Sequence, residues 1–481
     1  MNQHHPATRT EHDLLGDLDV PADAYYGIHT QRAVQNFAIS GIPVSIYPHF
    51  VRALAAVKQA AAVANRDLGL LPAPQADAVV AACEEIRAGK LHEQFVLDVI
   101  QGGAGTSTNM NANEVVTNRA LELLGHAKGE YQYLHPLNDV NRGQSTNDVY
   151  PTAIKIALDA HIVELIDNLE VLRLALAAKA TEFADVIKMG RTQLQDAVPM
   201  TLGQEFAAFA ITLSEDQTRL EEARLLLHEL NLGGTAIGTG LNAHPQYRER
   251  VVAELATITG IATLVSATDL IEATSDVGVF VQLSGVLKRV AVKLSKTAND
   301  LRLLSSGPRA GLNEINLPAR QAGSSIMPGK VNPVIPEVVN QVAFEVIGND
   351  VTITLAAEGG QLQLNAFEPI IAHSLFASLD HLGAAAVTLA DKCVSGITAN
   401  RELLHERVWN SIGLVTALSP ALGYENASSV AQEALASGRG VVDLVLERGL
   451  LSQAQIDELL SVTALTSNRG GLRAPFNPDE K

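Results

Sequence analysis

Hydrophobic residues recur every three or four positions through the middle of the chain, which is the period of an amphipathic helix. The clearest stretch is 151–183, which has no glycine and no proline after its first residue. Asn147 and Asp148 are good N-cap residues, and Pro151 is tolerated in a first helical turn. We therefore predict one long helix that begins between Gln144 and Pro151. Its apolar positions are Ile154, Leu158, Ile162, Leu165, Leu169, Leu172 and Leu176.

The same periodicity predicts four further long helices. They span about 196–228, 271–305, 336–357 and 361–392, and Pro369 is expected to kink the last of them. Five helices of this length predict an all-α fold built around a helix bundle. Apolar residues occur on more than one side of the helix at 271–305, and such faces need partners. We therefore also expect a homo-oligomer.

The ends of the chain follow a different pattern. Up to residue 144, glycines and prolines interrupt the periodicity, as in Gly102-Gly103-Ala104-Gly105, and after residue 401 the elements are shorter, as at 452–460. We predict a loop-rich helical domain at 1–144, a long-helix bundle at 145–401 and a small helical domain at 402–481, which ends in a polar tail.

Composition narrows the class of protein. Hydrophobic residues make up 47% of the chain but aromatics only 4%, which favours packed helices. A net charge of -18 argues against nucleic-acid or anionic membrane partners. The two cysteines, Cys83 and Cys393, form no disulfide framework, and neither a signal peptide nor an uncharged run of bilayer length is visible. We expect a cytoplasmic protein.

The most informative segment for chemistry is 323–333. It compresses Gly323, Ser324, Ser325, Lys330 and Asn332 into a short interval between two predicted helices. An ordinary polar loop is the simplest alternative. A phosphate-binding P-loop is excluded, because five residues separate the glycines of the motif and a valine stands where Ser or Thr is required.

A second candidate lies where the first long helix begins. Gln144-Ser145-Thr146-Asn147-Asp148 places two hydroxyls at a helix N-terminus, where free N–H groups and the positive end of the helix dipole favour a carboxylate. Simple helix capping would need only one of these side chains. Further turns rich in hydroxyls and amides occur at 105–111 and 190–193.

Three other patterns have simpler explanations. Ala436-Ser437-Gly438 matches the tripeptide that cyclises to an electrophilic prosthetic group in some enzymes, but it lies where a helix C-cap is expected. The glycines of 233–240 lack the dinucleotide-binding spacing. The 14 histidines show no metal-binding spacing, so we predict no metal site.

Together, the segments at 105–111, 144–148, 190–193 and 323–333 resemble the fumarase and aspartase superfamily, whose mark is the string GSSxMPxKxN at 323–332. The resemblance runs from about Arg9 to about residue 465. The stretches 25–30, 129–141, 188–193 and 334–337 look like aspartases rather than fumarases.

The resemblance implies a fold, an assembly and an activity. It implies a three-domain fold whose five long helices join in a homotetramer with a twenty-helix core and sites shared by three subunits. The implied reaction is the reversible anti-elimination of ammonia from L-aspartate to give fumarate. Ammonia leaves from a protonated amine, so no cofactor is expected to be required.

The resemblance also implies roles for individual residues. Ser324 is the general base that takes a proton from Cβ. The α-carboxylate is bound by Lys330, Asn332 and Thr192, and the β-carboxylate by Thr106, Ser145 and Thr146. Asn147 binds the amino group, and Gln193 and Ser325 are assigned to substrate binding.

Elimination passes through a doubly charged aci-carboxylate, so hydrogen-bond donors must be in place to receive that charge. A serine base in turn needs its alkoxide stabilised by loop N–H groups and Lys330.

The chain departs from the family pattern at two places. Arg142-Gly143 stands where the family usually has Met-Ser. Gln193 stands where fumarases and some aspartases have histidine, so it is assigned a binding role and no acid–base role. Two alternatives stay open at this point: a class II fumarate hydratase acting on fumarate and L-malate, and a non-catalytic relative resembling lens structural proteins.

Overall fold

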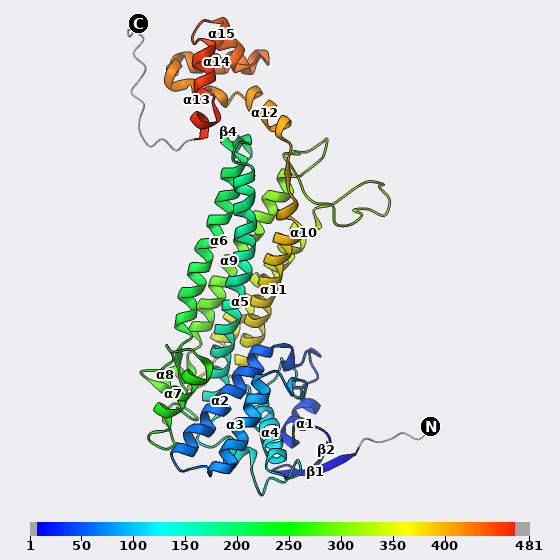
Figure 1. Ribbon diagram of the computed structural model, residues 1–481, viewed down its shortest axis with the longest axis vertical. Helices are drawn as coiled ribbons and strands as arrows, with labels where there is room; N and C mark the ends of the chain where they lie inside the picture. The colour runs from blue at the N-terminus through cyan, green and yellow to red at the C-terminus, as the bar shows by residue number, and fades with distance from the viewer. Residues whose placement is uncertain (1–6, 467–481) are drawn as a thin grey trace. The chain divides into compact units, whose positions relative to one another are not determined.

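The computed structural model describes residues 7–466, which divide into two compact units (Figure 1). Unit 1 contains residues 7–167, 216–291 and 343–383, and unit 2 contains residues 168–215, 292–342 and 384–466. Each unit combines stretches that are distant in sequence, because each boundary between the stretches falls within a long helix. The three consecutive domains expected from the sequence stay a prediction.

The N-terminal part of unit 1 is a hairpin followed by helices. Strands β1 (Thr8–Asp13) and β2 (Gly16–Pro21) pair antiparallel. Helices α1 (Ile28–Asn36), α2 (Pro48–Asp67), α3 (Ala73–Arg87) and α4 (Thr106–Leu123) follow, with short turns at Val44–Ile46, His92–Gln94 and Pro136–Val140. The alanine-rich α2 packs on both α3 and α4. Its small side chains let it be buried on several faces at once.

Five long helices form the bundle, as the hydrophobic pattern predicts. They are α5 (Thr146–Glu182), α6 (Leu202–Leu226), α9 (Gly278–Leu304), α10 (Val334–Glu358) and α11 (Glu368–Lys392) (Figure 1). The all-α prediction is confirmed. All seven apolar positions predicted for α5 are buried, so they form the stripe that faces the core.

Polar side chains connect neighbouring long helices inside each unit. In unit 1, Asp159 of α5 accepts a hydrogen bond from Arg224 of α6 at 2.6 Å, and Asp350 of α10 accepts one from Ser284 of α9 at 2.8 Å. In unit 2, Asn340 of α10 donates to Oγ of Ser295 in α9 at 2.8 Å. These bonds, which are buried or partly buried, fix the register of the helices.

The predicted start of the second long helix is wrong. Residues Gln195–Thr201 form strand β4, which pairs antiparallel with β3 (Ile187–Thr192). The pairing shifts register next to Pro199, and a bulge tolerates the missing N–H of proline. Helix α6 begins only at Leu202, where Thr201 and Gln204 donate to each other's side chains from the backbone, both at 3.0 Å.

Two other helix boundaries also need correction. The segment predicted at 271–305 is broken into α8 (Leu270–Ser275) and α9, because Asp276 accepts a hydrogen bond from the N–H of Gly278 at 3.1 Å and turns the chain. Helix α11 begins at Glu368 rather than 361. Pro369 therefore lies in its first turn, where no N–H is needed, and does not kink a continuing helix.

Short elements complete the two units. In unit 1, β5 (Glu229–Leu230) pairs with β6 (Val265–Ser266) beside α7 (Tyr247–Thr259). In unit 2, β7 (Ile315–Asn316) pairs with β8 (Thr398–Ala399), and a turn lies at Val394–Gly396. Six helices follow: α12 (Arg401–Asn410), α13 (Leu414–Leu422), α14 (Tyr424–Ser437), α15 (Val441–Glu447), α16 (Gln453–Leu459) and α17 (Val462–Thr466).

The C-terminal helices pack around a core that includes Val408, Leu414 and Val445. Two predictions are confirmed here. Ser452 caps the helix expected at 452–460, and α14 ends at Gly438 in the left-handed conformation, so the Ala436-Ser437-Gly438 tripeptide is a helix end. The predicted polar tail from 467 onward lies outside the described residues.

The stretch Glu368–Gly396, which contains α11, is long and apolar enough to meet the criteria for a membrane span. However, 61% of its most apolar stretch is buried inside the protein. A helix at the centre of a packed bundle meets the same criteria, because it too is apolar on most sides. Its apolar surface is covered by neighbouring helices.

Candidate active site

The loop at 323–333 belongs to unit 2, and its two ends are tied together. The N–H of Gly323 donates to the carbonyl of Lys330 at 2.8 Å, and Nδ2 of Asn332 donates to the carbonyl of Gly323 at 2.7 Å. A Cβ atom on residue 323 would lie 2.7 Å from the carbonyl oxygen of Lys330. Only glycine permits this closure, so Ser324 to Gly329 are presented as a closed loop.

The hydroxyl of Ser324 is held by the backbone of its own loop. Its Oγ accepts hydrogen bonds from the N–H groups of Ile326 at 3.1 Å and Met327 at 3.0 Å. Two N–H donors aimed at one oxygen stabilise negative charge on it. The side chain is half-buried, whereas Ser325 and Lys330 are exposed. The loop therefore supplies the alkoxide stabilisation that a serine base needs.

Thr192 and Gln193 lie at the tip of the β3–β4 hairpin, also in unit 2. Both are exposed, and Gln193 and Leu194 have φ angles of 53° and 62°. Two consecutive positive φ angles define the tight turn that matches the twist of a hairpin. The backbone conformation at these positions is strained for residues other than glycine, asparagine or aspartate, and such strain is concentrated at functional sites.

Behind this turn lies a buried ion network. Glu314 is 1% exposed and binds Lys188 at 2.9 Å and Arg191 at 2.6 Å, and Lys188 also binds Glu205 at 2.6 Å. Arg191, Gln193 and Glu205 line a cavity of about 300 Å³. The network fixes β3 and so fixes the position from which Thr192 projects.

The N-terminus of α5 lies in unit 1 and is capped by Ser145. Its Oγ accepts a hydrogen bond from the N–H of Asn147 at 3.2 Å. Nδ2 of Asn147 donates to the carbonyl of Ala236 at 2.7 Å, which leaves Oδ1 as the hydrogen-bond acceptor of this side chain. Because Ser145 accepts with its oxygen, its own hydroxyl hydrogen is free to donate to a ligand.

A cavity of about 380 Å³ opens at this helix end. Ser145 and Thr146 line it, whereas Thr106 and Asn147 are not among its lining residues. Thr106 is exposed and begins α4, one turn before Met110 of the lining. The cavity is lined by Asn109, Met110, Asn141, Gly143, Gln144, Ser145, Thr146, Thr235, Ala236, Leu241 and Asn242.

One buried lysine organises the amides of this cavity. Nζ of Lys58 donates to Oδ1 of Asn109 at 2.7 Å, to Oδ1 of Asn141 at 3.1 Å and to Oε1 of Gln144 at 2.8 Å. Three acceptors match the three hydrogens of an ammonium group. Burial lowers the pKa of Lys58 to about 7, and the charge of Asp148 opposes that shift.

Asp148 fastens the same helix end to a neighbouring loop. Oδ1 accepts from the N–H of Ser145 at 3.0 Å, and Oδ2 accepts from those of Gly233 at 3.1 Å and Thr235 at 2.9 Å. Burial raises the pKa of Asp148 to about 7 despite these bonds. The carboxyl group therefore joins the α5 N-terminus to the loop that forms the opposite wall of the cavity.

The ten candidate residues thus form two sets. Ser145 and Thr146 line the unit 1 cavity, and Thr106 and Asn147 are close in sequence to residues that line it. The other six lie on the 323–333 loop and the hairpin tip of unit 2. Sequence reasoning missed Lys58, Asn141 and the loop at 233–235. A lone charge in the alanine-rich run Ala55-Ala56-Val57-Lys58-Gln59-Ala60 was the available signal.

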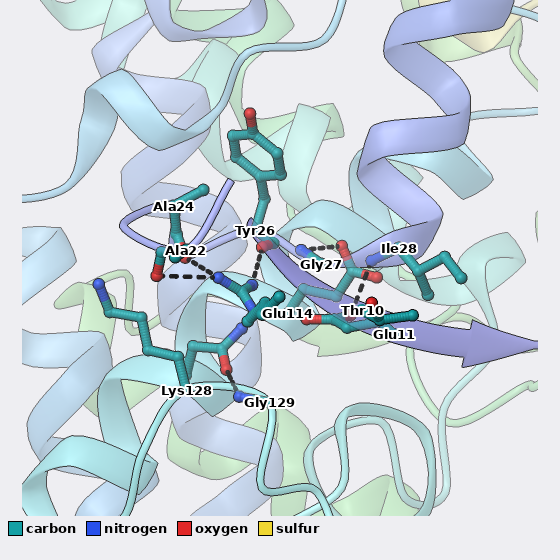
Figure 2. A network of polar contacts seen from close by, with 12 residues as sticks. Thr10, Glu11, Ala22, Ala24, Tyr26, Gly27, Ile28, Glu114, Lys128 and Gly129 are labelled. Atoms are coloured by element: carbon teal, nitrogen blue, oxygen red, sulfur yellow. Dashed lines mark hydrogen bonds and ion pairs between the residues drawn. The ribbon is translucent and has the colours of Figure 1, made fainter. Parts of the chain in front are cut away.

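The stretch 25–30, which looks aspartase-like, has a structural role in unit 1. Figure 2 shows the carboxylates of Glu11 and Glu114 turned toward the backbone at Gly27 and Ile28. Glu114 of α4 accepts from the N–H of Gly27 at 2.7 Å, and Glu11 accepts from that of Ile28 at 2.8 Å. A Cβ atom on residue 27 would lie 2.6 Å from Glu11 Oε2. The stretch therefore anchors the start of α1 to α4 and to the N-terminal hairpin.

Comparison with known families gives matches along most of the chain. Residues 16–348 match the family model described as lyase, and residues 414–467 match the model described as fumarase C C-terminus. An aspartate ammonia-lyase of Pseudomonas aeruginosa is 64% identical over 455 residues, which cover 94% of this chain and 96% of that one. An aspartate ammonia-lyase of Escherichia coli is 57% identical over 458 residues, covering 95% and 96%.

Solved structures share the fold. A fumarate lyase:delta crystallin from Brucella melitensis, in a crystal structure bound to cobalt, has a TM-score of 0.92 and 57% identity, covering 94% of this chain and 98% of that one. A class II fumarase from Schistosoma mansoni has a TM-score of 0.88 and 36% identity, with the same coverage. The relatives with the higher identities are the ammonia-lyases and the Brucella protein.

Proposed function

The chain belongs to the lyase family of fumarases and aspartases, and from this premise we infer that it eliminates ammonia from L-aspartate to give fumarate. The observation that carries this inference is the 57–64% identity to aspartate ammonia-lyases over nearly the whole chain. It is a carbon–nitrogen lyase, and its substrates are small molecules. A fumarase is less similar, at 36% identity.

We propose that Ser324 is the general base. Removing a proton from Cβ of aspartate leaves charge that the adjacent carboxylate must take up. The N–H groups of Ile326 and Met327 already donate to Oγ of Ser324, so they lower the cost of its alkoxide. Lys330, Asn332 and Thr192 bind the α-carboxylate in this scheme.

The α5 N-terminus is proposed to hold the β-carboxylate, which becomes the dianionic group. Oγ of Ser145 and Oγ1 of Thr146 both act as acceptors within the protein, the latter from Nδ2 of Asn109 at 3.1 Å. Their hydroxyl hydrogens therefore remain for the ligand. With the helix dipole, they form a set of donors that is in place before charge develops.

We further propose a homotetramer whose sites take residues from three subunits. Helix α10 supports this with an apolar stripe: Phe344, Val351 and Leu355 are 63%, 56% and 65% exposed and recur on one helical face. Large apolar residues in a row rarely face solvent on a monomer. Packing α10 against other copies would cover this stripe and build the proposed twenty-helix core.

The activity is tested by following fumarate absorbance with purified protein and either L-aspartate or L-malate. Rapid fumarate formation is expected from L-aspartate and not from L-malate, because the aspartase-like stretches include 334–337, which follow the family string at 323–332. Equal or faster conversion of L-malate would overturn the proposed substrate and favour a fumarate hydratase.

The shared site is tested by mixing two inactive variants, Ser145→Ala and Ser324→Ala. If these residues enter a site from different subunits, reassembled mixtures should recover activity, because about a quarter of the sites then carry both intact serines. Light scattering of each variant establishes that it is tetrameric. Mixtures as inactive as their parents would place both serines in one chain's site and contradict the shared arrangement.

A further inference from the structure

A separate group of side chains in unit 1 has the chemistry of metal ligands. His49 lies in the first turn of α2, and His161 and Glu164 lie one turn apart on α5. One nitrogen of each histidine and one carboxylate oxygen of Glu164 all lie within 4.8 Å of one another. None of the three belongs to the residues assigned to the elimination reaction.

His161 supplies the observation that points to a ligand. Its side chain is 3% exposed, and Nδ1 lies 2.9 Å from Oδ1 of Asp380 in α11. Its Nε2 is buried and has no hydrogen-bond partner among residues 7–466. A buried nitrogen without a partner is costly, so it needs an explanation.

The ring of His161 cannot rotate to bring Nε2 to another hydrogen-bond partner. It stacks on Phe376 with ring centroids 5.1 Å apart, and the rings of Tyr47 and His49 meet it edge-on at 6.5 Å and 4.7 Å. Its orientation is therefore set by packing and by Asp380.

The simplest alternative is two ordinary polar pairs. Nε2 of His49 lies 3.1 Å from Oε2 of Glu164, so these two groups satisfy each other without an ion. That pairing leaves Nε2 of His161 without a partner. A cation bound by all three groups satisfies every one of them.

We propose that His49, His161 and Glu164 bind one divalent transition-metal ion of the Zn²⁺ type. Two imidazoles and one carboxylate suit such an ion better than Mg²⁺ or Ca²⁺, which prefer oxygen ligands. Water would complete a four-coordinate site on the exposed side of Glu164. Asp380 acts as the outer partner of His161, holding its ring so that Nε2 faces the ion.

The ion would tie the start of α2 to α5 within unit 1. Zn–N bonds are about 2.0–2.1 Å, so the ligands must approach one another slightly from their present positions. Glu164 is 62% exposed and His49 26%, so both side chains have room to adjust. The site is structural in this account, since none of its ligands is assigned to the reaction.

Metal binding is tested on the full-length protein after removal of metals with a chelator. Zn²⁺ is titrated by calorimetry, and Co²⁺ by visible absorption, which reports nitrogen and oxygen coordination. One ion per chain is expected. His161→Gln and Glu164→Gln should weaken binding at least tenfold, and Asp380→Asn by about 10- to 100-fold, as for lost outer partners.

Two control variants separate this site from adventitious binding. His12→Gln removes an exposed histidine that pairs with Asp17 at 2.7 Å and belongs to no group of three metal-ligand side chains among residues 7–466. Replacing His4 and His5 together removes the adjacent histidines of the N-terminal segment. Both controls should bind Zn²⁺ as the unaltered protein does.

Thermal unfolding gives a second measurement. Zn²⁺ should raise the melting temperature of the unaltered protein and of both controls, but not that of Glu164→Gln, whose exposed side chain can be changed without disturbing the fold. Failure of the unaltered protein to bind one ion per chain would overturn the proposal. An unchanged affinity for Zn²⁺ in His161→Gln and Glu164→Gln would also overturn it. Neither result depends on which reaction the protein catalyses.

Discussion

The ammonium group of Lys58 donates to Oδ1 of Asn109 at 2.7 Å, and Nδ2 of Asn109 donates in turn to Oγ1 of Thr146 at 3.1 Å. This chain of bonds fixes which way each group points. The lysine sets the amide of Asn109, the amide occupies the oxygen of Thr146, and the hydroxyl hydrogen of Thr146 is left for a ligand. A residue on α2 thus prepares the helix end at which a carboxylate is proposed to bind.

Lys58→Met tests this positioning role. The variant leaves Oδ1 of Asn109 and Oε1 of Gln144 without a donor, whereas Oδ1 of Asn141 still accepts from two other amides, so it should lose about 3 kcal/mol of stability. The KM for L-aspartate and the inhibition constant of succinate should both rise at least tenfold, whereas kcat changes less. Steady-state kinetics and urea unfolding measure these effects.

Lys179→Met is the matched control for that variant. Lys179 is also buried, and its Nζ donates to the carbonyl of Ile397 at 2.8 Å and to Glu182 at 2.7 Å. It should lose stability with an unchanged KM. If Lys58→Met keeps a normal KM while folded, the lysine has only a structural role.

Asn147→Ala is expected to discriminate between ligands with and without an amine. It removes the proposed acceptor for the amino group, so the KM for L-aspartate should rise at least tenfold while binding of succinate weakens little. Asn231→Ala is the control, because Asn231 donates to the backbone carbonyl of Asn147 at 2.9 Å and should affect both ligands alike. Equal weakening of both ligands by Asn147→Ala would contradict the assigned role.

Lys330→Ala should weaken binding of the α-carboxylate. Deleting the cation is expected to raise both the KM for L-aspartate and the inhibition constant of succinate by tenfold or more. Arg309→Ala removes another exposed cation of unit 2 and should change neither value. Normal substrate affinity in Lys330→Ala would show that another group neutralises the carboxylate.

Glu368 predicts a pH dependence of stability. Its side chain is buried at the start of α11, and this burial raises its pKa from 4.5 to about 8, against the opposing charge of Lys155. Between these values the folded protein keeps a proton that the unfolded chain releases, so the free energy of unfolding falls as pH rises. The contribution of Glu368 to stability is fully present below pH 4.5 and is lost as the pH rises from 4.5 through about 8.

Glu368→Gln should remove that loss, because glutamine stays neutral. Urea unfolding gives the free energy of unfolding of both proteins at pH 5 and pH 8. The difference, variant minus unaltered protein, should be larger at pH 8 than at pH 5 by roughly a few kcal/mol. Glu358→Gln, which changes an exposed glutamate at the end of α10, serves as control. A difference between Glu368→Gln and the unaltered protein that is the same at both pH values would refute the linkage.

The sequence predicted the long helices well where a regular apolar stripe decides the structure, as in α5. It failed at helix starts, where local bonds decide: Thr201 and Gln204 begin α6 after a strand, and Asp276 interrupts the predicted third helix. Periodicity does not report such contacts, although the Thr-x-x-Gln spacing before α6 was readable as a capping signal.

The candidate site shows the same division. Ser324 and the α5 N-terminus could be found because their residues are contiguous. Lys58 could not be connected to Asn109, Asn141 and Gln144, because only the fold brings α2 beside them. His49 and His161 likewise come from different helices, and no spacing along the chain joins them.

The most direct test of the account is the rate of fumarate formation from L-aspartate by Ser324→Ala, compared with Ser325→Ala and the unaltered protein. Ser324 is held by two backbone N–H groups, whereas its neighbour Ser325 is exposed. We predict that Ser324→Ala loses kcat by several orders of magnitude while remaining folded and binding succinate almost normally, and that Ser325→Ala keeps most of its kcat. A near-normal kcat in folded Ser324→Ala would contradict the account, because another group would then remove the proton.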